Sequence, residues 1–141
     1  YSNQTLWPLF HHRIDLTAYE RSYGEGYERT NRRFAEVLQP LLQPDDVRAL
    51  YMYANGLVSL GERERGLDYA RRALALEPED PMLLYNVACV RCLAGEVEGA
   101  VECLEKAVRN GFAQKEWLQK DNNLDAARSH PRFQALLARW A

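Results

Sequence analysis

The sequence predicts an all-α fold: a short right-handed array of two helical-hairpin repeats, with an N-terminal helical cap and C-terminal capping helices. Three observations predict it. Identical residues recur at a separation of 34 positions, apolar residues recur at spacings of three and four, and no strand-like alternation with hairpin turns occurs in the 141 residues.

The two repeats are expected at 47–80 and 81–111. Aligning the first with the second pairs Tyr51 with Tyr85, Ala54 with Ala88, Gly61 with Gly95, Glu62 with Glu96 and Ala73 with Ala107. The alanines suit close helix crossings, and both glycines follow the end of a first helix, where a left-handed residue is common. Prolines at 78 and 81 bracket the turn between the repeats.

The flanks are predicted to cover the ends of this array. Residues 1–44 are expected to start extended and continue as a helix, in which Phe34, Leu38 and Leu41 would cover Leu50 and Leu57. In the second domain, 45–141, residues 112–141 follow the repeats and form a C-terminal cap whose last helix begins at 130–131.

The composition excludes some function classes. Eighteen basic against twenty acidic residues give a formal net charge of -2, without the basic excess of a nucleic-acid binder. No apolar run approaches the roughly 20 residues of a membrane span, and no signal peptide is expected at the start. The three cysteines are no disulfide framework, so reduced thiols and a cytoplasmic location are expected.

Residues 45–141 resemble the tetratricopeptide tails of bacterial multidomain signalling proteins such as adenylate cyclases and serine/threonine kinases. The resemblance rests on three runs of sequence: Arg72-Ala73-Leu74-Ala75-Leu76-Glu77-Pro78, Leu84-Tyr85-Asn86-Val87-Ala88-Cys89 and His130-Pro131-Arg132-Phe133. Such tails imply protein interaction rather than catalysis.

Residues 1–46 look instead like part of trehalose-6-phosphate synthase, a retaining glycosyltransferase. The matching runs include Leu6-Trp7-Pro8-Leu9-Phe10-His11, Gly26-Tyr27, Pro40-Leu41-Leu42 and Asp45-Asp46-Val47. The resemblance implies that Trp7 corresponds to a residue at the glucose-6-phosphate site, but the family's following His-Asp-Tyr-His motif is absent. The chain therefore looks composite, with a junction near 45–48, and it stays open whether this is a fusion or a likeness confined to a helical cap.

The candidate site is the concave face of the repeats, where first helices present side chains to a ligand. The register places eight residues there: Arg48, Tyr51, Asn55, Val58, Met82, Tyr85, Cys89 and Cys92. Tyrosine, arginine and asparagine suit peptide recognition. The alternative is that two repeats form too shallow a groove and the tyrosines merely pack.

Other motifs favour no chemistry. A zinc site at Cys89-x-x-Cys92 lacks further ligands, and adjacent His11 and His12 point to opposite sides of an extended segment. No nucleophile elbow or paired carboxylates occur. We expect a non-enzymatic module without metal or cofactor that binds a peptide or partner helix and neither nucleic acid nor membrane. The alternatives are a fragment of trehalose-6-phosphate synthase without its own activity, and a structural self-association module.

Overall fold

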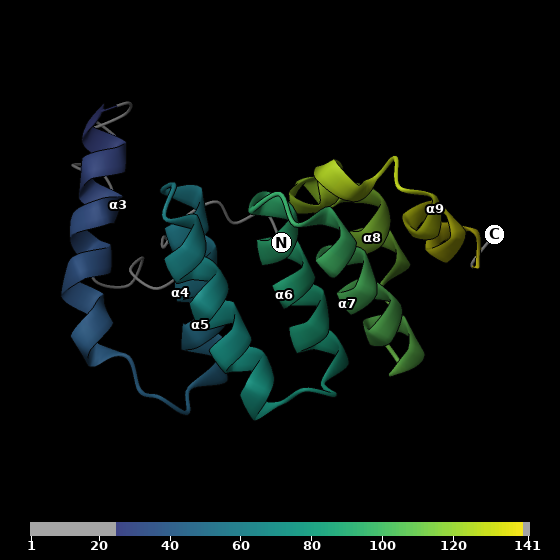
Figure 1. Cartoon of the computed structure of the whole chain (residues 1–141), viewed down its shortest axis with the longest axis horizontal. Helices are drawn as coiled ribbons and strands as arrows, with labels where there is room; N and C mark the ends of the chain where they lie inside the picture. The colour runs from purple at the N-terminus through teal and green to yellow at the C-terminus, as the bar shows by residue number, and fades with distance from the viewer. Residues whose placement is uncertain (1–24, 140–141) are drawn as a thin grey trace.

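The computed structural model describes residues 25–139, and this part of the chain is helical without strands. The elements are α3 (Glu25–Leu38), η1 (Gln39–Leu41), α4 (Val47–Ser59), α5 (Arg63–Leu76), α6 (Pro81–Leu93), α7 (Val97–Arg109), α8 (Lys115–Lys120), η2 (Asn122–Ala127) and α9 (Pro131–Ala138). Figure 1 shows them following one another in a row from α3 at one end to α9 at the other. The predicted all-α class is confirmed; the predictions for Trp7, His11, His12 and the extended start lie outside the described residues.

Two helical hairpins, α4–α5 and α6–α7, occupy the middle of the row, and equivalent residues begin their first helices. The Asp46 carboxylate accepts a hydrogen bond from the Ala49 amide at 3.0 Å, and the Asp80 carboxylate accepts one from the Leu83 amide at 2.9 Å. Each aspartate thus satisfies one amide that the first turn of a helix leaves without an intrahelical partner.

Glycines in the left-handed conformation end the same two helices. Gly61 has φ 89° and Gly95 has φ 84°, as predicted, and Gly111 repeats the conformation with φ 111°. After each glycine the next amide turns back to a carbonyl five residues earlier, at 2.9 Å from Glu62 and 2.8 Å from Glu96. These hydrogen bonds close each first helix and direct the chain into the second.

The core runs along the whole row. The alanines expected at close crossings, Ala54, Ala73, Ala88 and Ala107, are all completely buried. Helix α5 approaches α4 so closely that a Cβ atom on Gly66 would lie 2.5 Å from Val58 Cγ2 and 2.8 Å from the carbonyl oxygen of Ala54. The first hairpin therefore needs glycine at this crossing.

Two arginines, one on α3 and one on α5, each bond to the end of a helix in another element. Arg32 of α3 donates to the carbonyl of Leu60 at 2.7 Å, and Arg63 of α5 donates to the carbonyl of Ala94, also at 2.7 Å. These carbonyls sit at equivalent ends of α4 and α6. Helix α3 thus contacts α4 as α5 contacts α6.

One part of the predicted N-terminal packing is wrong. Leu38 is half-buried against the core, but Leu41 is 61% exposed and covers neither Leu50 nor Leu57. The reason is Pro40, because the α-helix ends before it and the following 3-10 turn rotates Leu41 outward. The side chain of Phe34 lies outside the described residues.

The C-terminal segment packs onto the second hairpin. Its apolar side chains Phe112, Leu118, Leu124, Ala127, Phe133 and Leu136 are buried. Arg128 donates to the carbonyls of Leu118 and Asp121 at 2.9 and 2.7 Å, which holds the turn between α8 and η2. Two short helices and a 3-10 segment thus cover the far side of the array.

Candidate partner-binding site

The eight predicted site residues lie on α4 and α6, but they differ in exposure. Arg48 is exposed, Tyr51 is half-buried and Met82 is 39% exposed. The other five are buried, with exposed fractions of 8% or less: Asn55, Val58, Tyr85, Cys89 and Cys92. The face is therefore accessible at α4 and at the start of α6.

The rest of the α6 face is covered by the chain itself. The Tyr85 hydroxyl donates to the Asp121 carboxylate at 2.5 Å, and its ring stacks on Phe112 with 4.6 Å between centroids and 8° between planes. Trp117 packs at 5.6 Å from the same ring. Tyr85 therefore contacts the C-terminal segment, and burial raises the pKa of its hydroxyl far above the usual value.

Asp121 is the residue that sequence reasoning missed. It is 4% exposed, and besides Tyr85 it accepts a hydrogen bond from the Asn123 amide at 2.9 Å. In the sequence, the run 121–123 predicts only a turn. Its pairing with Tyr85, 36 positions away, has no local signature.

The two cysteines of the Cys89-x-x-Cys92 motif are buried thiols beside this carboxylate. Cys89 Sγ lies 3.8 Å from Asp121 Oδ2, and burial, then the Asp121 charge, raises the pKa of Cys89 well above its usual value. The same two causes raise the pKa of Cys92 to about 11. Both thiols are thus protonated at neutral pH. Within residues 25–139 no three potential ligands gather to hold a metal ion.

The α4 part of the face keeps an unsatisfied polar atom. Asn55 is 6% exposed, and its buried Oδ1 has no hydrogen-bond partner among the described residues. Tyr51 and Arg48 lie on the same side of α4, one and two turns before Asn55 respectively. A buried acceptor without a partner is unfavourable unless a ligand donates to it.

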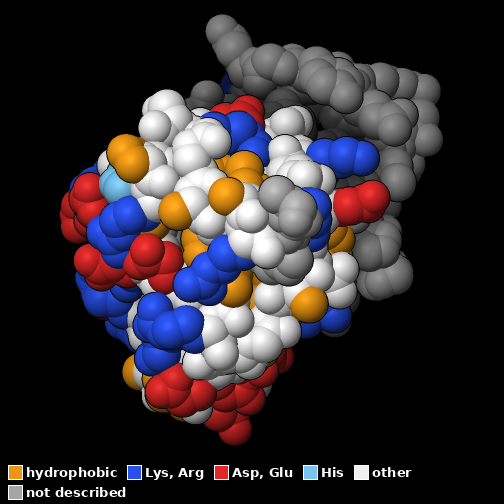
Figure 2. Space-filling view, turned by 90° about the vertical axis from the view of Figure 1, so that its right-hand side faces the viewer, with side chains coloured by type: hydrophobic (Ala, Val, Ile, Leu, Met, Phe, Trp, Pro, Cys, Tyr) orange, Lys and Arg blue, Asp and Glu red, His pale blue; other side chains and the backbone are white. Residues whose placement is uncertain are grey.

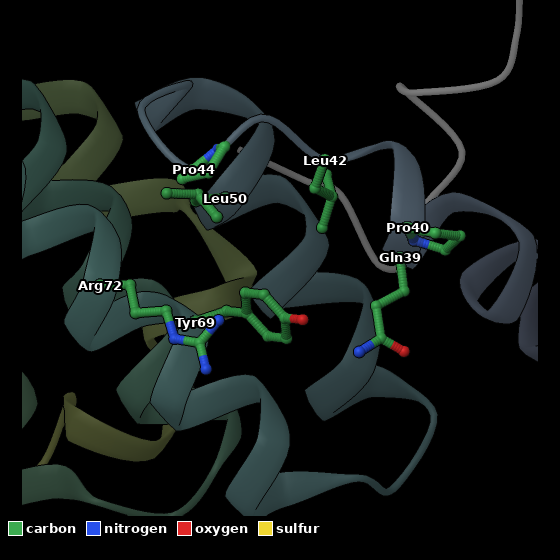
Figure 3. A pocket seen from close by; sticks show the side chains of 7 residues that line it. All are labelled: Gln39, Pro40, Leu42, Pro44, Leu50, Tyr69 and Arg72. Carbon is green, nitrogen blue, oxygen red and sulfur yellow. The ribbon is translucent and has the colours of Figure 1, made fainter.

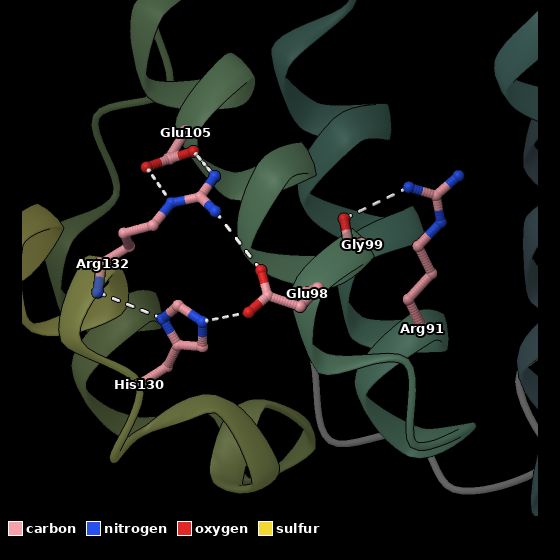
Figure 4. A network of polar contacts seen from close by, with 6 residues as sticks. All are labelled: Arg91, Glu98, Gly99, Glu105, His130 and Arg132. Carbon is pink, nitrogen blue, oxygen red and sulfur yellow. Dashed lines mark hydrogen bonds and ion pairs between the residues drawn. The ribbon is translucent and has the colours of Figure 1, made fainter.

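The α9 end of the molecule is polar. His130 Nε2 lies 2.9 Å from Glu98 Oε1, and Arg132 pairs with Glu98 and with both oxygens of Glu105 (Figure 4). The Arg132 amide donates to His130 Nδ1, so the ring proton sits on Nε2 and faces Glu98. In Figure 2, acidic and basic side chains are mixed on this face and hydrophobic ones are scattered.

Among the described residues, the large hydrophobic side chains that are exposed lie away from α9. The exposed large hydrophobic side chains are Val37, Leu41, Leu76, Met82 and Leu93. No helix within 25–139 has the length and apolar character needed to cross a membrane.

Comparison with known proteins finds similarity to trehalose-6-phosphate synthases over part of the chain. The chain is 45% identical over 53 residues to the enzyme of Klebsiella pneumoniae, which is 38% of this chain and 11% of that protein. The Sinorhizobium fredii enzyme is 41% identical over 68 residues, 48% of this chain and 15% of that protein. The Cronobacter sakazakii enzyme is 50% identical over 46 residues, 33% of this chain and 10% of that protein.

These matches support the resemblance drawn from the residues at 1–46, and the chain spans only a small fraction of each relative. The 68-residue match is longer than that segment, so the similarity continues beyond it. No protein-family model matches the chain.

Proposed function

We propose that this chain joins a segment derived from a trehalose-6-phosphate synthase to a tetratricopeptide-type helical array, and that the product binds a protein or peptide without catalysing sugar transfer. The first part is supported by the matches to known enzymes. The second is supported by the repeated geometry of the two hairpins.

The synthase-like segment is proposed to be inactive in this chain. The matched stretches correspond to 10–15% of the length of the relatives described above. In addition, the sequence passes from Val47 directly into Arg48-Ala49-Leu50, where the family's His-Asp-Tyr-His motif would follow. We expect no transfer of glucose from a nucleotide sugar to glucose 6-phosphate, assayed by release of the nucleoside diphosphate. Turnover that scales with the amount of this chain would contradict the proposal.

The array is proposed to consist of two tetratricopeptide-type repeats at 47–80 and 81–111. Aspartate caps, left-handed glycines and buried alanines recur at equivalent positions, and Arg32 and Arg63 make the same bond to successive repeats. Each repeat buries its apolar faces only against its neighbours, so the two outer faces of the pair need a cover. Helix α3 and the C-terminal segment supply that cover. We infer that residues 1–44 and 112–141 act as caps.

The proposed partner-binding surface is the α4 face formed by Arg48, Tyr51 and Asn55, extended by Met82. The observation that carries it is the Asn55 Oδ1 atom, a buried acceptor that the amide of a bound peptide would satisfy. The neighbouring Arg48 supplies a charge at the surface, and Tyr51 a large, half-buried ring.

This surface is tested by capture of cross-linked partners with the intact chain and with Arg48→Ala/Tyr51→Ala. We expect capture to be lost while the helical circular dichroism is kept, because both side chains reach the surface of α4. Glu102→Ala on α7, which is exposed and distant in sequence, serves as the control. Equal capture by all three proteins would remove the α4 face from the proposal.

Self-association is the alternative that one observation favours. Val37 and Leu41 are 56% and 61% exposed on neighbouring elements at the α3 end. Sedimentation of the wild type and of Val37→Ser/Leu41→Ser distinguishes the two functions. A dimer that the double substitution dissociates would favour self-association over partner binding.

A further inference from the structure

His130 is the one histidine within residues 25–139, and imidazole is the side chain that ordinarily changes charge between about pH 5 and 8. Thiols come next nearest to neutrality. Burial raises the pKa values of Cys89, Cys92 and Cys103, so these thiols keep their protons in this range. A response of the described chain to pH near neutrality is therefore expected at the α9 end.

The pocket at the α3 end has no such group among its described lining residues. It has a volume of about 310 Å³ and lies between the α3–α4 connection and α5 (Figure 3). Its titratable lining residues are Tyr69 and Arg72, which line it beside Gln39 and Pro40. Tyrosine and arginine ordinarily change charge only near pH 10 and above about pH 12. The two ends of the molecule thus differ in the chemistry that could sense pH.

The two nitrogens of the His130 ring have different roles (Figure 4). Nδ1 accepts a hydrogen bond from the Arg132 amide at 3.1 Å and so caps the first turn of α9, while Nε2 lies 2.9 Å from Glu98 Oε1 on α7. A backbone N–H can only donate, so Nδ1 carries a lone pair. The cap therefore needs the neutral ring.

Protonation of the ring removes this cap. A charged imidazole donates from both nitrogens in either orientation of the ring, so an N–H would then face the Arg132 amide. The pair with Glu98 gains charge and still holds the ring on α7, but it supplies nothing to the amide. The Arg132 amide thus loses the acceptor that the structure gives it.

The other charged groups at this end keep one charge over the same range. They include Glu98, Glu102, Glu105 and Arg109 on α7, Asp125 and Arg128 around the end of η2, Arg132 on α9, and Lys115, Glu116 and Lys120 on α8. The hydrogen bond with His130 lowers the pKa of Glu98, and the one with Arg132 lowers the pKa of Glu105. Carboxylates, lysine and arginine ordinarily stay ionised between about pH 5.5 and 8.

Helix α9 is short enough to depend on its first turn. It has 8 residues, Pro131–Ala138, and an isolated helix of this length is not stable in water. Its buried side chains are Phe133 and Leu136, and Phe133 stands in that first turn. Loss of the cap therefore loosens the attachment of α9 to α7.

We propose that His130 is a pH-sensitive helix cap, in which the neutral ring closes the first turn of α9 onto α7 and proton binding opens it. The start of α6 has the same arrangement without the sensor. There Asp80 precedes Pro81, as His130 precedes Pro131, and its carboxylate accepts from the Leu83 amide. The proposal uses neither the α4 face nor the synthase-like segment, so it does not depend on the proposed function.

The test is nitrogen-15 NMR of the full chain at about pH 7.5 and pH 5.5. We expect the Arg132 amide signal to move with the same midpoint as the ring signals of His130. Protection of the Leu136 and Leu137 amides from hydrogen exchange, corrected for intrinsic rates, should fall about tenfold at the lower pH, as expected for the loss of one cap. Protection of the Leu83 amide should change by less than about twofold, because the Asp80 carboxylate keeps its lone pairs.

Two substitutions bracket the wild type. His130→Asn keeps a cap acceptor at both pH values, whereas His130→Ala has none at either. The wild type should therefore resemble His130→Asn at pH 7.5 and His130→Ala at pH 5.5. His11 and His12 are the same in all three proteins, so their titration cancels in the comparison.

Four outcomes would overturn the proposal. They are equal protection of α9 in the wild type at both pH values, the same pH response in His130→Asn as in the wild type, full protection of α9 in His130→Ala, and an equal fall at Leu83 and α9. The last would show a general loss of stability in place of a local opening.

Discussion

The two hairpins have the same plan but treat equivalent positions differently. Tyr51 on α4 is half-buried, whereas Tyr85, 34 positions later, is fully buried and bonded to Asp121. Asn55 and Cys89 form the next equivalent pair. The Asn55 Oδ1 atom has no hydrogen-bond partner among the described residues, whereas the Cys89 thiol lies beside the Asp121 carboxylate. The difference shows that equivalent positions of the two hairpins are surface or core according to what the chain places beside them.

The largest test of this comparison is truncation of the two tyrosines. Tyr85→Ala removes a stacked ring and one of the donors to the buried Asp121 carboxylate, so it should lower the free energy of unfolding by about 3–5 kcal/mol. Tyr51→Ala should lower it by about 1 kcal/mol or less, because its ring is partly solvated. Urea denaturation measures both, and equal losses would show that the C-terminal segment does not distinguish the hairpins.

The helix crossings provide the second test. Gly66→Ala would drive a Cβ atom against Val58 and the Ala54 carbonyl, which should destabilise the fold by about 1–3 kcal/mol despite the better helix propensity of alanine. At the equivalent position of the second hairpin, Ala100→Gly should cost about 1 kcal/mol. A stabilising Gly66→Ala in thermal unfolding would mean that the two crossings are alike.

The three buried thiols all lie in the second hairpin, and they predict that this hairpin contributes a pH dependence to stability. In the unfolded chain a cysteine ionises near pH 8.5, whereas Cys92 keeps its proton in the fold until its pKa of about 11. The folded state therefore binds more protons than the unfolded chain between these two pKa values. The stability that the Cys92 thiol contributes is fully present below pH 8.5 and is lost as the pH rises through 11. Cys92→Ala should reduce the fall in the urea midpoint between pH 8 and pH 10.5, and an unchanged fall would assign it to other groups such as Cys89 and Tyr85.

The smallest difference in stability between the hairpins is expected at their two N-terminal helix caps, because both hairpins use the same aspartate cap there. Asp46→Ala and Asp80→Ala each remove one hydrogen bond to a first-turn amide, so each should cost about 1 kcal/mol. Thermal unfolding of the two variants should give equal shifts. A much larger loss for one would indicate that its cap also supports the contact between hairpins.

Much of the local structure could be predicted from residue types. Short-range chemistry predicts the left-handed Gly61 and Gly95, the buried Ala54 and Ala88 and the helix start at Pro81. The glycines and alanines also recur at a separation of 34 residues, which strengthens their prediction. Exposure of the candidate site was less predictable. Tyr51 and Tyr85 carry the same local pattern, and only a contact with residue 121 makes one of them core.

The sequence by itself determined the helical class and the turn glycines of the hairpins, because caps, turn glycines and apolar spacing act within a few residues. Only the tertiary structure decided which side chains remain at the surface. Asp121 approaches Tyr85, 36 positions away, and Gln39 and Pro40 line one pocket with Tyr69 and Arg72. Such contacts depend on how whole helices pack, which no local pattern records.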